Sequence, residues 1–191
     1  MKHRSSNSLL KWALLCEGLL ICAVACSTSV DGQNASGAGT PVAVTRLVVT
    51  YGTNTSSLRN SGLIDKERVV VRERATWEVV WKRILKGAPS FSMSPSGEIV
   101  PNDPPAPEID FAKEMLLVVM MGQQPTSGYS ISVDSAKEFA DRVEAEVVSV
   151  SPNRKQCILL MMVTSPIDIV RLPKTDKTVV FHETEVIRDC K

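Results

Sequence analysis

The sequence predicts an α+β domain that is predominantly antiparallel β, a β-rich sheet or sandwich with one amphipathic helix packed on it. Two observations predict this class. Short apolar and β-branched segments recur from residue 42 onward, most of them separated by short turns. Only residues 76–86 combine helical length with the 3.6-residue apolar period of an amphipathic helix. Without an internal repeat, an antiparallel meander is the simplest topology for these elements.

The N-terminal residues predict export. Three basic residues precede or open an apolar stretch that ends at Ala25 and is interrupted by Glu17 and Gly18. This stretch is too short to cross a hydrocarbon core of about 30 Å, so residues 1–25 are expected to be a signal peptide. Small residues immediately before Cys26 resemble the bacterial lipobox, in which the cysteine is lipidated. We therefore expect a lipid on Cys26 to anchor the exported chain to the cell-envelope membrane; secretion without lipid and a retained membrane segment are the alternatives.

The remainder divides into a tether and one domain. Residues 26–41 are mainly small and polar, which predicts a flexible tether, and residues 42–191 form a single domain of ordinary size. The chain is 43% hydrophobic and 23% charged, which is typical of a protein with a core. Its formal net charge is only +1. This balance gives no electrostatic basis for binding nucleic acid or an anionic membrane surface.

The first two strands and the helix follow in order. Val42–Tyr51 and Arg68–Glu73 are rich in β-branched residues and predict strands. In the helix, Thr76 is the expected N-cap, Glu78 lies in the expected first turn and Gly87 supplies the stop. The apolar stripe of the helix consists of Trp77, Val80, Trp81, Ile84 and Leu85. We expect both tryptophans to anchor the core; a ligand platform is the alternative.

The second half of the domain predicts more strands. Residues 88–107 hold six of the eleven prolines and predict a surface loop. Met115–Met121 is apolar at every position, so a strand covered on both faces is expected. Further strands are predicted at Tyr129–Val133, Val143–Val150, Cys157–Val163, Ile167–Leu172 and Thr178–Phe181. Cys157 is expected to be a small buried apolar residue and Cys190 a mobile one, and a disulfide between them is the alternative.

A short polar loop lies between two of the predicted strands and is the candidate binding loop. It consists of Gly122, Gln123, Gln124, Pro125, Thr126, Ser127, Gly128 and Tyr129. Proline fixes one backbone angle, and the two glycines can take positive φ at little cost. Such a stiff loop is either a rigid hairpin turn or a recognition element, and its residues alone do not decide between the two.

The ordered motifs of this region resemble one family. DFAKEMLLVVMMGQQPTSGYSISV is followed by SVSP, by LLMMVTSPIDIVRLPK and by VVF. This series is similar to the PrcB C-terminal domain family over residues 68–182. The family comprises secreted or lipid-anchored bacterial domains and is named for an accessory subunit of a surface protease complex. The family usually has Gly-Gly before the tyrosine, and here Ser127 replaces the first glycine.

No residue pattern predicts catalysis, a metal site or a cofactor. His182 is the single histidine of the domain and is expected to be a solvated group at the end of the last strand. Glu108 and Asp110 predict a solvated turn, and Glu144 and Glu146 the solvent face of a strand. Motifs of zinc and serine hydrolases are absent from the sequence. We therefore expect a protein that is not an enzyme.

These observations support three functional hypotheses. The first is a lipid-anchored accessory domain that docks on or stabilises a partner protein, and the resemblance implies an exported protease as that partner. The second is a protease-inhibitor-like module in which residues 122–129 occupy an active-site cleft. The third is a small hydrolase with His182 as its base, which the lack of catalytic partners disfavours.

Overall fold

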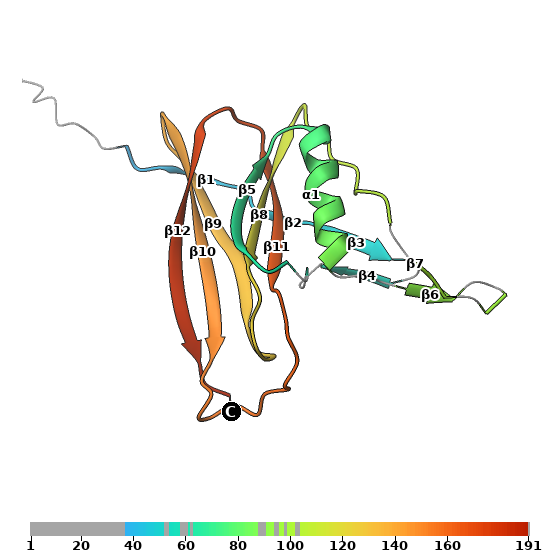
Figure 1. Ribbon diagram of the computed structural model, residues 1–191. Coiled ribbons are helices and arrows are strands. Elements are labelled where there is room, and N and C mark those ends of the chain that lie inside the picture. The colour runs from blue at the N-terminus through green and yellow to red at the C-terminus, as the bar shows by residue number, and fades with distance from the viewer. Residues whose placement is uncertain are drawn as a thin grey trace, which may run out of the picture. The chain divides into compact units, whose positions relative to one another are not determined.

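The computed structural model describes residues 37–190, apart from residues 52–53, 58–60, 62, 88–90, 94–95, 98 and 102–103. The predicted signal peptide, Cys26 and most of the predicted tether lie outside the described residues. Within the described part of the chain, no helix has the length and apolar character needed to cross a membrane. The described residues form an α+β fold dominated by strands, as predicted, with two mostly antiparallel four-stranded sheets and one helix (Figure 1).

Sheet A has the spatial order β1-β9-β10-β12. Its strands are β1 (Thr40–Val42), β9 (Ser130–Glu138), β10 (Arg142–Pro152) and β12 (Thr178–Arg188). β9 is antiparallel to β1 and β10, whereas β12 runs parallel to β10. Since β1 begins at Thr40, the last two residues of the predicted tether belong to this sheet.

Sheet B has the spatial order β2-β11-β8-β5, and all of its neighbouring strands are antiparallel. Its strands are β2 (Thr45–Arg46), β11 (Ile167–Pro173), β8 (Glu114–Met121) and β5 (Lys66–Val71). Two small hairpins complete the described strands: β3 (Val48–Tyr51) with β4 (Asn54–Ser57), and β6 (Phe91–Met93) with β7 (Ile99–Pro101). The predicted first strand, residues 42–51, is therefore split among three sheets, and the predicted proline-rich loop contains a hairpin.

Strand β8 lies between two apolar layers, which confirms the prediction that it is covered on both faces. Leu116, Val118 and Met120 face the helix side of sheet B. Met115, Leu117 and Val119 alternate with them and face sheet A. The domain therefore stacks the helix, sheet B and sheet A in that order, with one core in each interval (Figure 1).

Helix α1 (Arg74–Gly87) buries the predicted stripe against sheet B. The tryptophan rings lie 5.3 Å apart between centroids, and the indole N–H groups of Trp77 and Trp81 donate to the carbonyls of Pro107 and Pro104. The prediction that they anchor the core is confirmed.

The start of this helix differs from the prediction. Because the helix begins at Arg74, Thr76 is not the N-cap; its hydroxyl donates to the Glu73 carboxylate at 2.9 Å. Glu78 lies beyond the first turn, which contains no acidic residue, and pairs with Arg74 at 3.0 Å.

The predicted meander is wrong, because the chain passes repeatedly between the two sheets. β8 and β9 are consecutive but lie in different sheets, and the same is true of β10 and β11. Since β11 returns through sheet B between β10 and β12, these two strands of sheet A point in the same direction. The last strand also extends to Arg188, so His182 lies within it and not at its end.

Two charged contacts tie the layers together. Asp168 on β11 is buried, and its carboxylate accepts hydrogen bonds from the Arg46 guanidinium at 2.6 and 2.9 Å and from the Val133 N–H at 3.0 Å. It therefore links β2, β11 and β9.

Between β5 and β12, Glu183 accepts from Arg68 at 2.7 Å and Lys66 at 2.9 Å. Partial burial raises the pKa of Glu183, but these two hydrogen bonds outweigh burial and hold the pKa below its ordinary value.

Candidate functional site

The candidate binding loop crosses from sheet B to sheet A. Residues 122–129 connect the end of β8 to the start of β9, and residues 153–166 connect β10 to β11 at the same end of the sheets. The two crossings are paired at Gln124 and Thr164. We call residues 122–129, 153–164 and 188–190 together the loop end. The loop is therefore not a hairpin turn between paired strands.

The backbone of the loop is held along most of its length. Gln124 donates to the Thr164 carbonyl at 2.7 Å and accepts from the Thr164 N–H at 3.0 Å. The Gln123 N–H donates to the carbonyl of Ile64 at 2.9 Å, and the Ser127 N–H to the carbonyl of Leu160 at 3.0 Å. These bonds make the loop rigid, as its proline and glycines suggested.

The two glycines of the loop are required for different reasons in addition to their positive φ angles of 76° and 93°. A Cβ at Gly122 would lie 2.7 Å from the backbone oxygen of Ile64, a clash with backbone that cannot be relieved by a rotamer change. A Cβ at Gly128 would meet the side chains of Pro152 and Leu159 at 3.1 and 3.2 Å. Gly128 therefore gives the second crossing room to pack against the first.

Ser127 has a structural role that glycine could not fill. Its Oγ accepts a hydrogen bond from the Leu160 N–H at 2.9 Å, so serine and leucine are joined twice. The departure from the usual Gly-Gly pair thus strengthens the contact between the two crossings. Tyr129 acts similarly, because its hydroxyl oxygen accepts from the Arg154 guanidinium at 3.1 Å. Thr126 is buried, and its hydroxyl has no hydrogen-bond partner among the described residues.

The segment after Cys157 is exposed and forms no strand, so the strand predicted at Cys157–Val163 is wrong. Ile158 is 100% and Met161 is 89% exposed. Leu160, Met162 and Val163 are each more than half exposed, whereas Leu159 is only partly exposed. The segment forms no strand, because it lies beyond the ends of β10 and β11 and no sheet continues there. The sequence pattern does not indicate this exposure, because an unbroken apolar run is also what a buried strand contains.

The cysteine prediction also needs correction. Cys157 and Cys190 form a disulfide with an S–S distance of 2.04 Å. The expectation of a buried, unbonded Cys157 and a mobile Cys190 is therefore wrong, and the alternative, a disulfide between them, is found. The bond joins the start of the apolar segment to the residues after β12. Asn153 supports the same junction: its N–H donates to the Arg188 carbonyl and its side-chain amide to Asp189, each at 2.8 Å.

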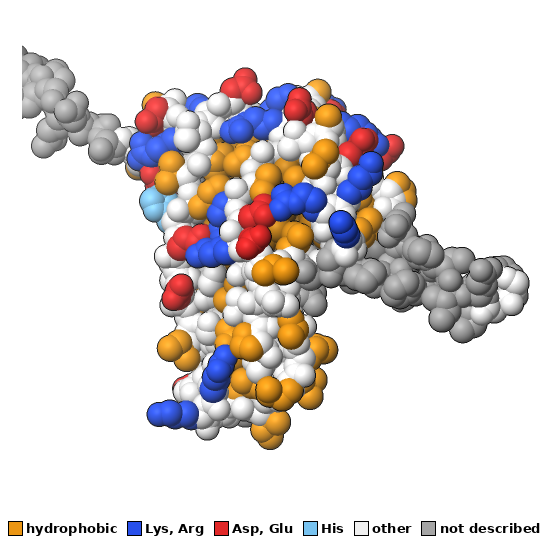
Figure 2. All heavy atoms as spheres, viewed as in Figure 1, with side chains coloured by type: hydrophobic (Ala, Val, Ile, Leu, Met, Phe, Trp, Pro, Cys, Tyr) orange, Lys and Arg blue, Asp and Glu red, His pale blue; other side chains and the backbone are white. Residues whose placement is uncertain are grey.

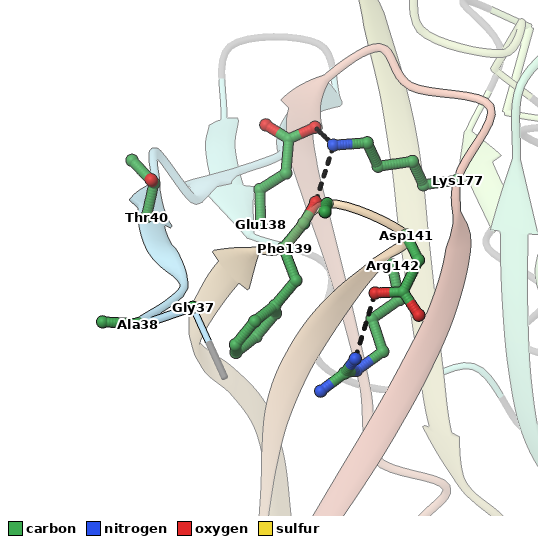
Figure 3. A pocket seen from close by; sticks show the side chains of 9 residues that line it. Gly37, Ala38, Thr40, Glu138, Phe139, Asp141, Arg142 and Lys177 are labelled. Carbon is green, nitrogen blue, oxygen red and sulfur yellow. Dashed lines mark hydrogen bonds and ion pairs between the residues drawn. The ribbon is translucent and has the colours of Figure 1, made fainter. Parts of the chain in front are cut away.

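A hollow of about 530 Å³ lies at the opposite end of sheet A, beside β1 (Figure 3). Its cationic groups already have partners. Lys177 contacts the Glu138 carboxylate at 2.9 Å and the Phe139 carbonyl at 2.7 Å. The Arg142 guanidinium lies 4.5 Å from the centre of the Phe139 ring and 3.0 Å from Asp141. This hollow is therefore a stabilised strand corner with little capacity left for an anionic ligand.

The remaining titratable candidates lie away from the loop end. His182 is exposed in the middle of β12 and lies 3.4 Å from the Glu144 carboxylate. Glu144 and Glu146 alternate with buried residues on β10, as predicted, and Glu108 and Asp110 are exposed. His182 is thus not brought to the loop hydroxyls. Among the described residues no cluster of metal-binding side chains occurs.

The comparison with known families concerns the region that builds this site. Residues 115–173 match the family model described as PrcB C-terminal. The predicted resemblance is confirmed over this span, which is shorter than residues 68–182. It runs from β8 to β11 and so contains both crossings, including the candidate binding loop and the apolar segment. No curated protein and no solved structure matches the chain.

Proposed function

We propose that this protein is a non-catalytic accessory domain, anchored by a lipid on Cys26, that docks on a partner protein through its loop end. One observation carries the docking part: two sheet-crossing segments are held rigidly together and display exposed apolar side chains instead of packing them. A rigid surface loses little conformational entropy on association. The PrcB C-terminal match suggests a protease-associated complex, and so an exported protease as the partner.

The inhibitor hypothesis is less well supported. An inhibitory loop that lies in a protease cleft offers its backbone to the enzyme. Here the backbone groups of Gln123, Gln124 and Ser127 bond to neighbouring segments of the chain itself. The third hypothesis, a hydrolase with His182 as base, has no nucleophile within the described contacts of that histidine.

Docking is tested with variants of the loop and of the Glu144/Glu146 face of β10. Ser127→Asp and Tyr129→Ala are expected to weaken capture of the partner from envelope extracts, whereas Glu144→Gln and Glu146→Gln are expected to leave it unchanged. Equal tolerance on both faces would show that the loop is only a connection. An assay of the captured protease with the purified domain separates docking from inhibition, since docking alone leaves its activity unchanged.

Anchoring is tested separately by metabolic labelling. Palmitate label is expected in the full-length chain and is expected to disappear in Cys26→Ala. Equal labelling of the two proteins would contradict the lipid anchor without bearing on docking.

A further inference from the structure

The exposed side chains of residues 158–163 belong to neither core of the domain. Each large aliphatic side chain left in water forgoes the favourable free energy of burial. Five such side chains lie together here: Ile158, Leu160, Met161, Met162 and Val163. Figure 2 shows hydrophobic side chains gathered at the end of the domain where the loop end lies, with basic side chains beside them. Contiguous apolar surface of this kind marks interaction sites, unlike scattered single residues.

The segment is also preorganised. Cys157 before it is fixed by the disulfide, Leu160 within it by two hydrogen bonds to Ser127, and Thr164 after it by two to Gln124. Leu159 turns inward against Gly128. The exposed side chains are therefore presented from a fixed backbone, so that ordering this surface for binding requires little further entropy loss.

Basic residues flank the apolar surface. Arg154 and Lys155 lie in the turn before it, and Arg188 lies at the end of β12, while Asp189 is engaged by Asn153. Two loop ends meeting symmetrically would bring these cations together, which opposes a homodimer through this surface. The same charges favour a partner with carboxylates around its binding site.

The position of the segment opposes insertion into the membrane that carries the proposed anchor. β1 enters at the far end of sheet A, and the 11 residues of β10 separate that end from the loop end by about 36 Å. The tether predicted between Cys26 and Thr40 would have a typical end-to-end distance of about 20 Å, which is shorter than this separation. The segment also contains no tryptophan or tyrosine, the residues that favour a lipid interface.

We propose that residues 158–163 form an apolar wedge that enters an apolar cleft of a partner protein, with carboxylates of that protein facing Arg154, Lys155 and Arg188. This inference rests on the proposed docking function and specifies the surface and the chemistry that it recognises. A lipid bilayer and a second copy of this chain are the competing occupants.

Photocrosslinking identifies the occupant in cells that produce the full chain. A benzophenone side chain replaces Met161, or Val79 on the exposed face of α1 as the control, since that valine is 61% exposed. A third probe replaces Gln123 in the candidate loop. The expected result is a protein adduct from position 161 and none from position 79, with acidic residues beside the crosslinked apolar peptide.

Affinity measurements with the purified, identified protein complete the test. Ile158→Ser combined with Met161→Ser is expected to weaken binding by at least about 100-fold, because two anchoring side chains are lost. The matched Val79→Ser variant is expected to bind as the wild type does. Lys155→Glu is expected to lower the association rate by about tenfold at low salt. A melting temperature of the double variant within about 2 °C of wild type verifies that its fold is intact.

Three results would overturn the wedge. The first is that the wild type sediments with phosphatidylethanolamine–phosphatidylglycerol vesicles and the double variant does not. The second is that the wild type forms a dimer and the double variant does not. The third is that the double variant binds the identified protein with the same Kd as the wild type. A protein adduct from position 123 without one from position 161 would retain the proposed docking function and reject the wedge. No protein adduct from either position would reject both.

Discussion

The disulfide between Cys157 and Cys190 is expected to contribute substantially to stability. The bonded residues are 33 positions apart, which corresponds to an entropy of about 12.5 cal/mol/K removed from the unfolded chain, or about 3.7 kcal/mol at 25 °C. Neither cysteine is fully buried, so replacing both with serine changes native packing little. The Cys157→Ser/Cys190→Ser variant should therefore lose about 3–4 kcal/mol of unfolding free energy.

Urea unfolding followed by tryptophan fluorescence measures this loss, because Trp77 and Trp81 lie in the core. The melting temperature should fall by about 7–15 °C, on the scale usual for a domain of this size. Reduction of the wild type should reproduce the loss found in the serine variant. A loss below about 1 kcal/mol would refute the entropic reasoning, and free thiols in the exported protein would refute the bond itself.

Three other predictions concern the core, an ion pair and the loop. Trp81→Ala should lower the unfolding free energy by about 3–5 kcal/mol, since the ring is 2% exposed; a loss no greater than that of Val79→Ala would contradict its core role. Because Glu183 has a lowered pKa in the folded protein, its stabilisation is present at neutral pH and is lost in acid, as the pH falls through that lowered pKa. Glu183→Gln should therefore lower the unfolding free energy by less than about 1 kcal/mol at pH 7, and its melting temperature should equal that of wild type at low pH. A difference in melting temperature that grows in acid would refute the stabilising role of the Glu183 carboxylate. Gly122→Ala should lower the unfolding free energy by about 1–3 kcal/mol, and by more than Gly97→Ala, because Gly97 has a positive φ but a Cβ there would meet no other atom. Equal losses for the two variants in urea unfolding would show that the clash with the Ile64 backbone does not add to the cost of the positive φ.

The parts of the fold that could be predicted are those in which local periodicity reports burial. The helical stripe around Trp81 and the alternation on β10 each reflect one buried face of one element, so a short window contains the information. Element ends were less predictable. Arg74 begins the helix although Thr76 has the better capping side chain, because the end of β5 sets where the chain turns.

Local sequence could not separate β8 from residues 157–163. Met115–Met121 and residues 158–163 are both unbroken runs of leucine, methionine and valine or isoleucine. The first run lies between two layers, whereas the second lies beyond the sheets. The difference depends on which strands adjoin each run, a property of the whole topology. The same holds for the disulfide, because Cys157 and Cys190 meet only through the parallel pairing of β10 and β12.

The candidate site was therefore predicted in part. Residues 122–129 were recognised from their turn chemistry, and they do occupy one end of the domain. Their neighbours were missed, because Leu160 and Thr164 are more than 30 positions away and contact the loop through backbone groups that carry no sequence signal. The departure at Ser127 from the usual glycine of the PrcB C-terminal pattern is visible in the sequence, but the contact of its hydroxyl with the Leu160 N–H is visible only in the structure.

Different residues of the domain provide stability and the proposed docking surface, because the chain passes between its sheets outside the two cores. The cores lie on the two sides of sheet B, and none of the five exposed aliphatic residues of the wedge belongs to either core. Stability and docking should therefore respond to different substitutions: Trp81→Ala acts on the first, and Ile158→Ser on the second. The disulfide affects both, because it restricts the unfolded chain and fixes the start of the wedge. Reducing it at a temperature where the domain stays folded should thus weaken binding without unfolding, and unchanged binding under those conditions would show that the wedge is held sufficiently by Ser127 and Gln124.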